Sequence, residues 1–155
     1  MDIHALETRD IVRVLPLMEE EWKEIRSLRV DLVVDPTKRF DPLSLKAYIA
    51  DENHLCYAVE LGGEMVAFAL AEVQLPSNQK LFGPKKSLVI RDLYVVPEYR
   101  RRKIGESLVR ALLTQADELG CVDLHLDLRK EYKDAIAFVE ALGLIPLSFR
   151  YGMEM

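Results

Sequence analysis

The spacing of apolar residues predicts two helices in the first fifty residues. After a short strand at residues 2–6, apolar side chains recur near the 3.6-residue period of a helix, at Ile11, Val14, Leu15, Met18, Trp22, Ile25 and Leu28. The segment Asp35–Pro42 holds two prolines and is expected to be a loop. A second, shorter helix should follow at about residues 44–50.

The middle of the chain is predicted to form strands. Two apolar runs, His54–Leu61 and Met65–Gln74, are joined by Gly62 and Gly63, which is typical of a β-hairpin. The segment Leu75–Lys86 is expected to be a polar loop. Residues 87–96 then form a third, buried strand, which ends at Pro97 because proline has no backbone N–H to donate.

The last third alternates between helix and strand. A helix after residue 103 ends at Gly120 and keeps one apolar face, formed by Ile104, Leu108, Leu112, Ala116 and Leu119. Residues 122–128 alternate as in a strand, with Val122, Leu124, Leu126 and Leu128 on one side and Asp123, His125 and Asp127 on the other. A helix over Glu131–Leu142 and two short strands within Leu144–Met155 complete the chain.

The order β-αα-ββ-β-α-β-α-ββ predicts the α/β (α+β) class, with a mixed central sheet of about seven strands flanked by four helices. A length of 155 residues fits a single domain that spans residues 1–155. A chain of this size can bury roughly two-thirds of its surface, so it needs no disulfide or metal to fold.

Charge and composition exclude several classes of protein. The chain has 26 acidic and 21 basic residues, a net charge of −5 that argues against nucleic-acid binding. Fifteen of the acids lie in residues 1–75, whereas 13 of the bases lie in residues 76–155. No apolar run is long enough to span a membrane, and no secretory signal is visible, so we expect a cytoplasmic protein.

Cysteine and histidine give no metal-binding pattern. Cys56 and Cys121 lie far apart in apolar, strand-like segments, so we expect them to be buried or inert thiols. The histidines, His4, His54 and His125, do not have the spacing of metal ligands. We therefore expect no metal.

The densest charged feature is the basic run at residues 100–103, between a predicted buried strand and an amphipathic helix. A helix that starts directly after a strand presents unpaired N–H groups, which favour an anion. Guanidinium groups suit phosphate, and Gly105 would allow close backbone approach. The alternatives are a solvated basic surface or a nucleic-acid patch, and the acidic composition disfavours the latter.

Two segments resemble the GNAT (GCN5-related N-acetyltransferase) superfamily. Asp92–Gly105 reads DLYVVPEYRRRKIG and is similar to its acetyl-CoA-binding signature. Tyr132–Leu144 reads YKDAIAFVEALGL and is similar to the second family segment, usually written NxxAIxFYExxGF. The order of elements also matches, so the resemblance covers nearly the whole chain and implies the GNAT fold.

The resemblance implies acetyl-CoA as cosubstrate. The strand end, residues Leu93, Tyr94, Val95 and Val96, would pair with the pantetheine arm. The pyrophosphate would lie on Arg100, Arg101, Arg102, Lys103, Ile104, Gly105, Glu106 and Ser107. The family uses neither a metal nor a covalent intermediate, because the amine attacks the thioester directly.

This reaction needs a base, since a primary amine with a pKa near 10.4 is mostly protonated at neutral pH. Glu72 shares a predicted strand face with Val66, Phe68 and Leu70, where burial would raise its pKa. Asp92 lies just before the pantetheine-binding segment. Each carboxylate has a structural alternative, as the partner of a buried arginine or of backbone amides.

The chain departs from the family pattern at three positions. Lys103 replaces the first glycine of the signature, and Val139 replaces the tyrosine that commonly protonates the leaving thiolate. Tyr132 replaces the usual asparagine and becomes a candidate acid, with Tyr94 and Tyr151 as further candidates that could equally be core or rim residues.

Two functions follow from these residues. The first is an N-acetyltransferase that acts on a primary amine of a small molecule or peptide, and the acidic first half favours a cationic acceptor such as a polyamine, aminoglycoside or lysine-like group. The alternative, motivated by Val139, is a non-catalytic acyl-CoA-binding module with a sensing or partner-binding role. Edge strands at the C-terminus make a homodimer possible.

Overall fold

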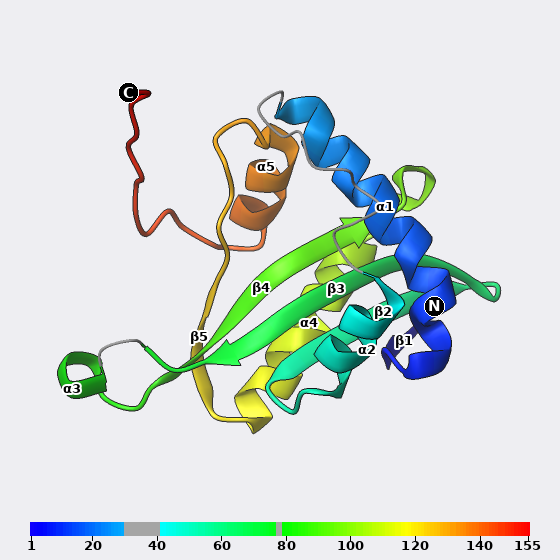
Figure 1. The fold of residues 1–155 in the computed structure, drawn as a ribbon, viewed down its shortest axis with the longest axis horizontal. Helices are drawn as coiled ribbons and strands as arrows, with labels where there is room; N and C mark the ends of the chain where they lie inside the picture. Colours follow the sequence, from blue (N-terminus) through cyan, green and yellow to red (C-terminus); the bar gives the residue numbers. More distant parts are fainter. Residues whose placement is uncertain (30–40, 77–78) are drawn as a thin grey trace.

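A five-stranded mixed sheet runs through the centre of the protein, in the order β1-β2-β3-β4-β5 (Figure 1). The computed structural model describes residues 1–29, 41–76 and 79–155. The strands are β1 (Asp2–Ala5), β2 (His54–Leu61), β3 (Glu64–Gln74), β4 (Lys86–Val95) and β5 (Cys121–His125). The first four are antiparallel neighbours, whereas β5 is parallel to β4. The predicted fold class and the hairpin at Gly62 and Gly63 are confirmed.

Helices cover both faces of the sheet (Figure 1). On one face lie α1 (Ile11–Leu28) and α2 (Pro42–Ala50), and on the other lies α4 (Ile104–Glu118). The remaining helices are α5 (Lys133–Ala141), the single turn α3 (Gln79–Phe82) inside the predicted polar loop, and the 3₁₀ turns η1 (Thr8–Asp10) and η3 (Pro97–Tyr99). No helix in the described ranges is both long and apolar enough to cross a membrane. Most of the predicted loop Asp35–Pro42 lies outside the described residues.

Two apolar clusters fill the layers between sheet and helices. The cluster under α4 holds Val59, Ala69, Leu88, Leu108 and Leu112 among its buried members. The cluster under α1 and α2 is built from Val14, Leu45, Phe68, Leu70 and Tyr94 with their neighbours. Each strand therefore contributes alternate residues to opposite layers, as the pleat of a strand requires.

Three β-bulges change which face a residue occupies. Ala67 pairs with Val59 and Met65 with Glu60, so Val66 is an extra residue in β3. As a result Val66 joins the cluster under α4, and its predicted position on the face of Phe68 and Leu70 is wrong. A bulged residue has no partner opposite it, which shifts the alternation by one position.

The same effect moves a residue of β5. Lys86 pairs with Cys121 and Ser87 with Asp123, so Val122 is the extra residue. Its side chain is 62% exposed, although the sequence predicts that it shares the inner face of Leu124. Cys121 and Leu124 pack against the cluster under α4 instead.

The structure differs from the sequence-based expectation in residues 144–155. The two predicted strands are not formed there, and the segment leaves the end of α5 and extends away from the rest of the protein (Figure 1). The sheet of the described chain therefore has five strands instead of about seven. Its β5 edge is left open on the side away from β4.

Candidate functional site

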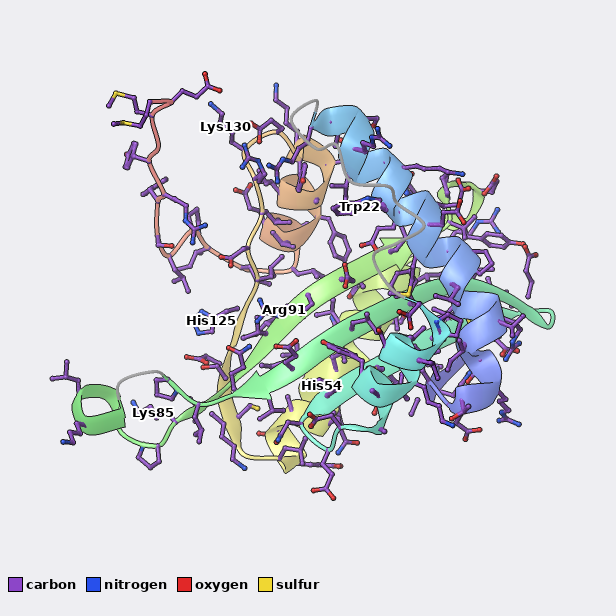
Figure 2. All side chains as sticks on the ribbon, viewed as in Figure 1. Trp22, His54, Lys85, Arg91, His125 and Lys130 are labelled. Atoms are coloured by element: carbon purple, nitrogen blue, oxygen red, sulfur yellow. The ribbon has the colours of Figure 1, made fainter. Side chains whose placement is uncertain are left out.

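An open strand edge forms the first part of the candidate site. β4 pairs with β5 only from Lys86 to Val89, and β5 ends at His125. Over residues 90–95, no described strand pairs with β4 on this side. The bulge at Arg91 lies just where the pairing stops, and Figure 2 shows Arg91 and His125 on the two strands close to this point.

The backbone of Leu93 and Val95 faces this open edge. The N–H of Val96 donates to the carbonyl oxygen of Val66 in β3, at 2.9 Å. Because successive residues of a strand direct their backbone groups to opposite sides, Leu93 and Val95 direct theirs away from β3. This is the direction in which an added extended chain can pair with β4.

The basic loop, residues 100–103, follows directly after η3 and leads into α4. Arg101 and Lys103 both have a left-handed backbone, with φ of 64° and 62°. Such alternation directs successive backbone N–H groups toward one point, which makes an anion-binding concavity. Lys103 is also the N-cap of the 15-residue helix α4, whose first N–H groups no side chain caps. Loop and helix together favour a bound phosphate.

Some side chains of the basic loop contact other parts of the protein, and others do not. The terminal nitrogen of Arg100 lies 2.7 and 2.9 Å from the two carboxylate oxygens of Glu24, and its Nε donates to the carbonyl oxygen of Val95 at 2.8 Å. Arg102 lies over the ring of Tyr99, 5.2 Å from its centroid. Within the described residues, Arg101 and Lys103 form no ion pair. These two side chains are the ones best placed to reach a phosphate.

Gly105 has a packing role that the sequence does not reveal. A Cβ atom there would lie 3.1 Å from Cζ of Phe138 on α5 and 3.7 Å from Cγ2 of Val95. The absence of a side chain therefore lets α5 approach α4 beside the open edge of β4. Close approach of a phosphate is not the only reason for glycine at this position.

Replacing Lys103 by glycine is expected to stabilise the ligand-free protein. A non-glycine residue in the left-handed region costs roughly 1–2 kcal/mol, which the greater freedom of unfolded glycine partly offsets. The net gain of about 0.5–1 kcal/mol should raise Tm by about 1–4 °C in thermal unfolding. Lys103→Ala is the control, because it removes the charge but keeps the Cβ atom, and an equal gain from alanine would contradict the strain argument.

Glu72 is held by three donors on the face of the sheet that α1 and α2 cover. Its Oε1 accepts from the Tyr48 hydroxyl at 3.0 Å, and its Oε2 accepts from Gln74 at 2.7 Å and from Arg91 at 3.1 Å. Burial raises the pKa of Glu72, but hydrogen bonds from Arg91, Gln74 and Tyr48 outweigh burial and hold it below its ordinary value. The raised pKa predicted from sequence is therefore wrong.

Asp92 is buried on the same face, one strand closer to the open edge. It pairs in register with Leu70 and is 5% exposed. The bulge at Arg91 moves Asp92 and Tyr94 to the α1 side of the sheet, while Leu93 and Val95 pack toward α4. The structure thus brings Glu72 and Asp92 to one face, on neighbouring strands.

Comparisons with known proteins assign the family. The family model described as "Acetyltransferase (GNAT) family" matches residues 15–144. The chain belongs to the GNAT acetyltransferase family. The [ribosomal protein bS18]-alanine N-acetyltransferase of Escherichia coli K12 is 29% identical over 111 residues, which are 70% of this chain and 68% of that protein.

Solved structures confirm the GNAT fold. A tetramutant of the BH1408 protein from Bacillus halodurans superposes with a TM-score of 0.90 at 18% identity, over 100% of both chains. A ribosomal-protein-alanine N-acetyltransferase from Brucella melitensis biovar Abortus 2308 gives 0.71 at 19% identity, again over 100% of both chains. At these identities the similarity concerns the fold alone.

The remaining candidates of this GNAT protein lie on α4, on α5 and, in the case of Tyr94, on β4. Tyr132 is the N-cap of α5, half-buried, and Val139 lies two turns later. In the first turn of α4, Glu106 accepts from Arg110, and Ser107 Oγ donates to the Lys103 carbonyl at 2.9 Å. The buried Tyr94 has a pKa raised to about 12, because of burial and the nearby Glu24.

The described residues hold one group of possible metal ligands, His4, Asp10 and Glu60, at the far end of the sheet. Arg13 pairs with both carboxylates, so its charge stands where a cation would bind. We assign this cluster to the anchoring of α1 on β1 and β2. The Cys56 thiol is buried, which raises its pKa to about 12 and agrees with the predicted inert cysteine.

Sequence reasoning missed three residues of the site. Arg91 binds Glu72 from the bulge, and the only signal for it is a second charged residue, next to Asp92, between two apolar parts of the strand. Tyr48 reaches Glu72 from α2, and Glu24 reaches Arg100 from α1. Both contacts join residues that are distant in the sequence, so no local sequence pattern indicates them.

Proposed function

We propose that this protein transfers an acetyl group from acetyl-CoA to a primary amine. The observation that carries the proposal is the open edge of β4 leading directly into the basic loop and the start of α4. The pantetheine arm contains amides that can pair with a strand edge, and the pyrophosphate is an anion suited to the helix start. One ligand would therefore use both features, with its thioester beside residues 90–93.

The reaction requires one bond exchange, the transfer of an amine proton to a base, and protonation of the leaving thiolate. The neutral amine attacks the thioester carbonyl carbon, a C–N bond forms, and the C–S bond then breaks to release the CoA thiolate. We assign the amine proton to Asp92, directly or through one water, because Asp92 lies on the strand that borders the open edge. Glu72, which is one strand further away and held by three donors, is a positioning residue for Arg91 and Tyr48.

Carboxylates on α1 favour a cationic acceptor. Glu20, Glu21 and Glu24 all lie close enough to the Tyr94 hydroxyl to raise its pKa. Two of these acids already have a cationic partner, Glu24 in Arg100 and Glu20 in Lys23, so only part of their negative charge is left to attract an acceptor. An amine that arrives protonated is attracted to such a surface before it loses its proton.

The relatives support two acceptor types. One curated relative is named for acetylation of an alanine of a ribosomal protein, and similar folds include an aminoglycoside acetyltransferase from an uncultured soil sample, with a TM-score of 0.74. We propose an amine of a peptide or small molecule. The amine panel for this protein should contain a peptide with N-terminal alanine, a lysine peptide, a polyamine and an aminoglycoside.

The test combines binding with turnover. Calorimetric titration should show binding of acetyl-CoA, and release of free thiol should depend on one amine of the panel. Acetyl-CoA binding with no turnover on any amine would favour the non-catalytic acyl-CoA-binding module, for which Val139 in place of an acid is the observation. No binding of acetyl-CoA would overturn both functions.

We expect Tyr132→Phe to lower kcat by about 10²-fold, the low end of the range for a general acid. The reason is that Tyr132 lies at the start of α5 and would protonate the leaving thiolate, whose thiol pKa near 8.5 makes this help modest. Steady-state kinetics provide the measurement. Tyr151→Phe, at a 91% exposed position, is the control, and equal kcat values for the two variants would remove Tyr132 from the mechanism.

A further inference from the structure

The bulge at Arg91 brings two neighbouring side chains of β4 to the same face of the sheet. Consecutive side chains of a regular strand point to opposite faces, but a bulged residue interrupts this alternation. Arg91 has no partner opposite it in β3, and its guanidinium contacts Glu72 on the face that α1 and α2 cover. Asp92 lies opposite Leu70, whose side chain belongs to the cluster under α1 and α2. A guanidinium and a carboxylate therefore lie on one face, where the pairing of β4 with β5 has ended.

The guanidinium of Arg91 is held in place but keeps donors for a ligand. Its Nε and one terminal nitrogen both lie 3.1 Å from Oε2 of Glu72, which is itself held by Tyr48 and Gln74. This contact uses two of the five N–H donors of an arginine. Among the described residues Arg91 has no second ion pair, and 45% of its side chain is exposed. Figure 2 shows Arg91 beside α2, at a part of the sheet that no helix covers in this view.

The charges around Arg91 favour a neutral oxygen as its ligand. Its pKa is raised by the hydrogen bond with Glu72 and, to a smaller extent, by the charge of Asp127, so Asp127 also lies near the guanidinium. Together with Asp92, three carboxylates surround one arginine. A ligand carboxylate would be repelled by them. A carbonyl oxygen carries no net charge and can still accept hydrogen bonds from the outer side of the guanidinium.

We propose that Arg91 binds the carbonyl oxygen next to the reacting amine, so that the acceptor is an α-amino amide such as the N-terminus of a peptide. This inference rests on the proposed acetyl transfer, in which Asp92 takes the amine proton. The nitrogen and oxygen of an α-amino amide are about 3 Å apart. With a hydrogen bond of about 2.9 Å at either end, this unit joins groups up to about 8 Å apart, here Asp92 and Arg91.

Arg91 discriminates against amines that have no neighbouring carbonyl. A polyamine or a lysine side chain would displace water from Arg91 and leave its donors unpaired, and such a mismatch lowers kcat/KM. The amines also differ without the protein, because an α-amine has a pKa near 7.7–8.0 and a lysine amine one near 10.4. More of the α-amine is therefore neutral at pH 7. A test of Arg91 has to separate its contribution from this intrinsic difference.

One peptide with an N-terminal alanine and a single internal lysine carries both amines. Mass spectrometry of the product gives the ratio of kcat/KM for the α-amine over that for the lysine amine. Arg91→Lys keeps the charge that pairs with Glu72 but lacks the planar fork, so it should lower this ratio at least about tenfold. An arginine with a merely structural role would lower both rates and leave the ratio unchanged. Gln74→Leu removes another donor of Glu72 and is the matched control, with a ratio expected within about threefold of the wild type.

Binding without turnover isolates the carbonyl oxygen. The peptide is titrated into the protein loaded with CoA, which has no acetyl group to transfer, and is compared with the same peptide whose first amide is replaced by a trans-alkene. The alkene keeps the shape of the amide but lacks its oxygen. In the wild type the Kd of the alkene peptide should be at least about tenfold higher. In Arg91→Lys the two Kd values should differ less than about threefold, because the donors that distinguish the peptides are absent.

Three results would each overturn this acceptor class and leave acetyl transfer in place. They are an equal loss for both amines in Arg91→Lys, equal Kd values of the amide and alkene peptides in the wild type, and faster turnover of a polyamine or aminoglycoside than of the N-terminal amine. If acetyl-CoA binds but no amine is acetylated, the proposed transfer is wrong. The titration of the two peptides still decides in that case whether Arg91 binds the carbonyl oxygen.

Discussion

Asp92→Asn is expected to lower kcat by a factor of about 10² to 10⁴, the usual contribution of a general base. The substitution keeps the size of the side chain but removes the carboxylate that we propose takes the amine proton. Asp92 is buried on β4, next to the bulge at Arg91, where the pairing with β5 has ended. Steady-state kinetics with the best amine of the panel measure kcat, and titration of acetyl-CoA should give an unchanged Kd.

Glu72→Gln is the matched control for this assignment. Glutamine keeps the shape of the side chain, and Glu72 lies on the same face of the sheet, so both variants remove one negative charge from the same layer. We expect a loss of less than about tenfold in kcat, because Glu72 acts through Arg91 and Tyr48. A large loss for Glu72→Gln with normal kcat for Asp92→Asn would transfer the role of base to Glu72.

Reversing the charge of Arg101 and Lys103 together should raise the Kd of acetyl-CoA by at least about 100-fold at 0.1 M salt. Hydrogen bonds to charged groups contribute roughly 1.5–3 kcal/mol each, and a factor of ten corresponds to about 1.4 kcal/mol. Both side chains are exposed at the start of α4. The double variant Arg101→Glu with Lys103→Glu keeps a Cβ atom at both left-handed positions, so backbone strain is not altered.

The control for this reversal makes the same change in net charge elsewhere. Arg9 follows β1 and Lys46 lies on α2, and both are exposed. Arg9→Glu with Lys46→Glu should leave the Kd of acetyl-CoA within about threefold, since exposed charges beyond a Debye length of about 10 Å are largely screened. Equal Kd values for the two double variants, measured by calorimetry, would contradict the position of the phosphate site.

Local patterns were sufficient for most of the elements. The 3.6-residue period placed α1 and α4, because one face of each helix must pack on the sheet. Gly62 and Gly63, both with positive φ, placed the hairpin between β2 and β3. The basic loop was located by its position between a strand and a helix, which is a feature of sequence order alone.

The pattern of apolar and polar residues could not predict the β-bulges. An extra residue such as Val66 or Val122 has no signature of its own, since it is defined by the partner strand that skips it. The polar contacts of the site have the same origin. Glu72 was predicted to have a raised pKa from its apolar neighbours, but Tyr48 and Arg91 reach it from elements that only tertiary packing brings close.

The sequence by itself determined the family, the order of elements and the anion-binding start of α4. These depend on residues that are neighbours along the chain, where spacing and backbone chemistry act directly. The tertiary structure decided which basic side chains remain available, which face Asp92 occupies, and that residues 144–155 leave their own sheet. Those outcomes depend on contacts between segments that are distant in the sequence. Which segments pair depends on the alternative pairings that the whole fold allows, and a local sequence pattern holds no information about them.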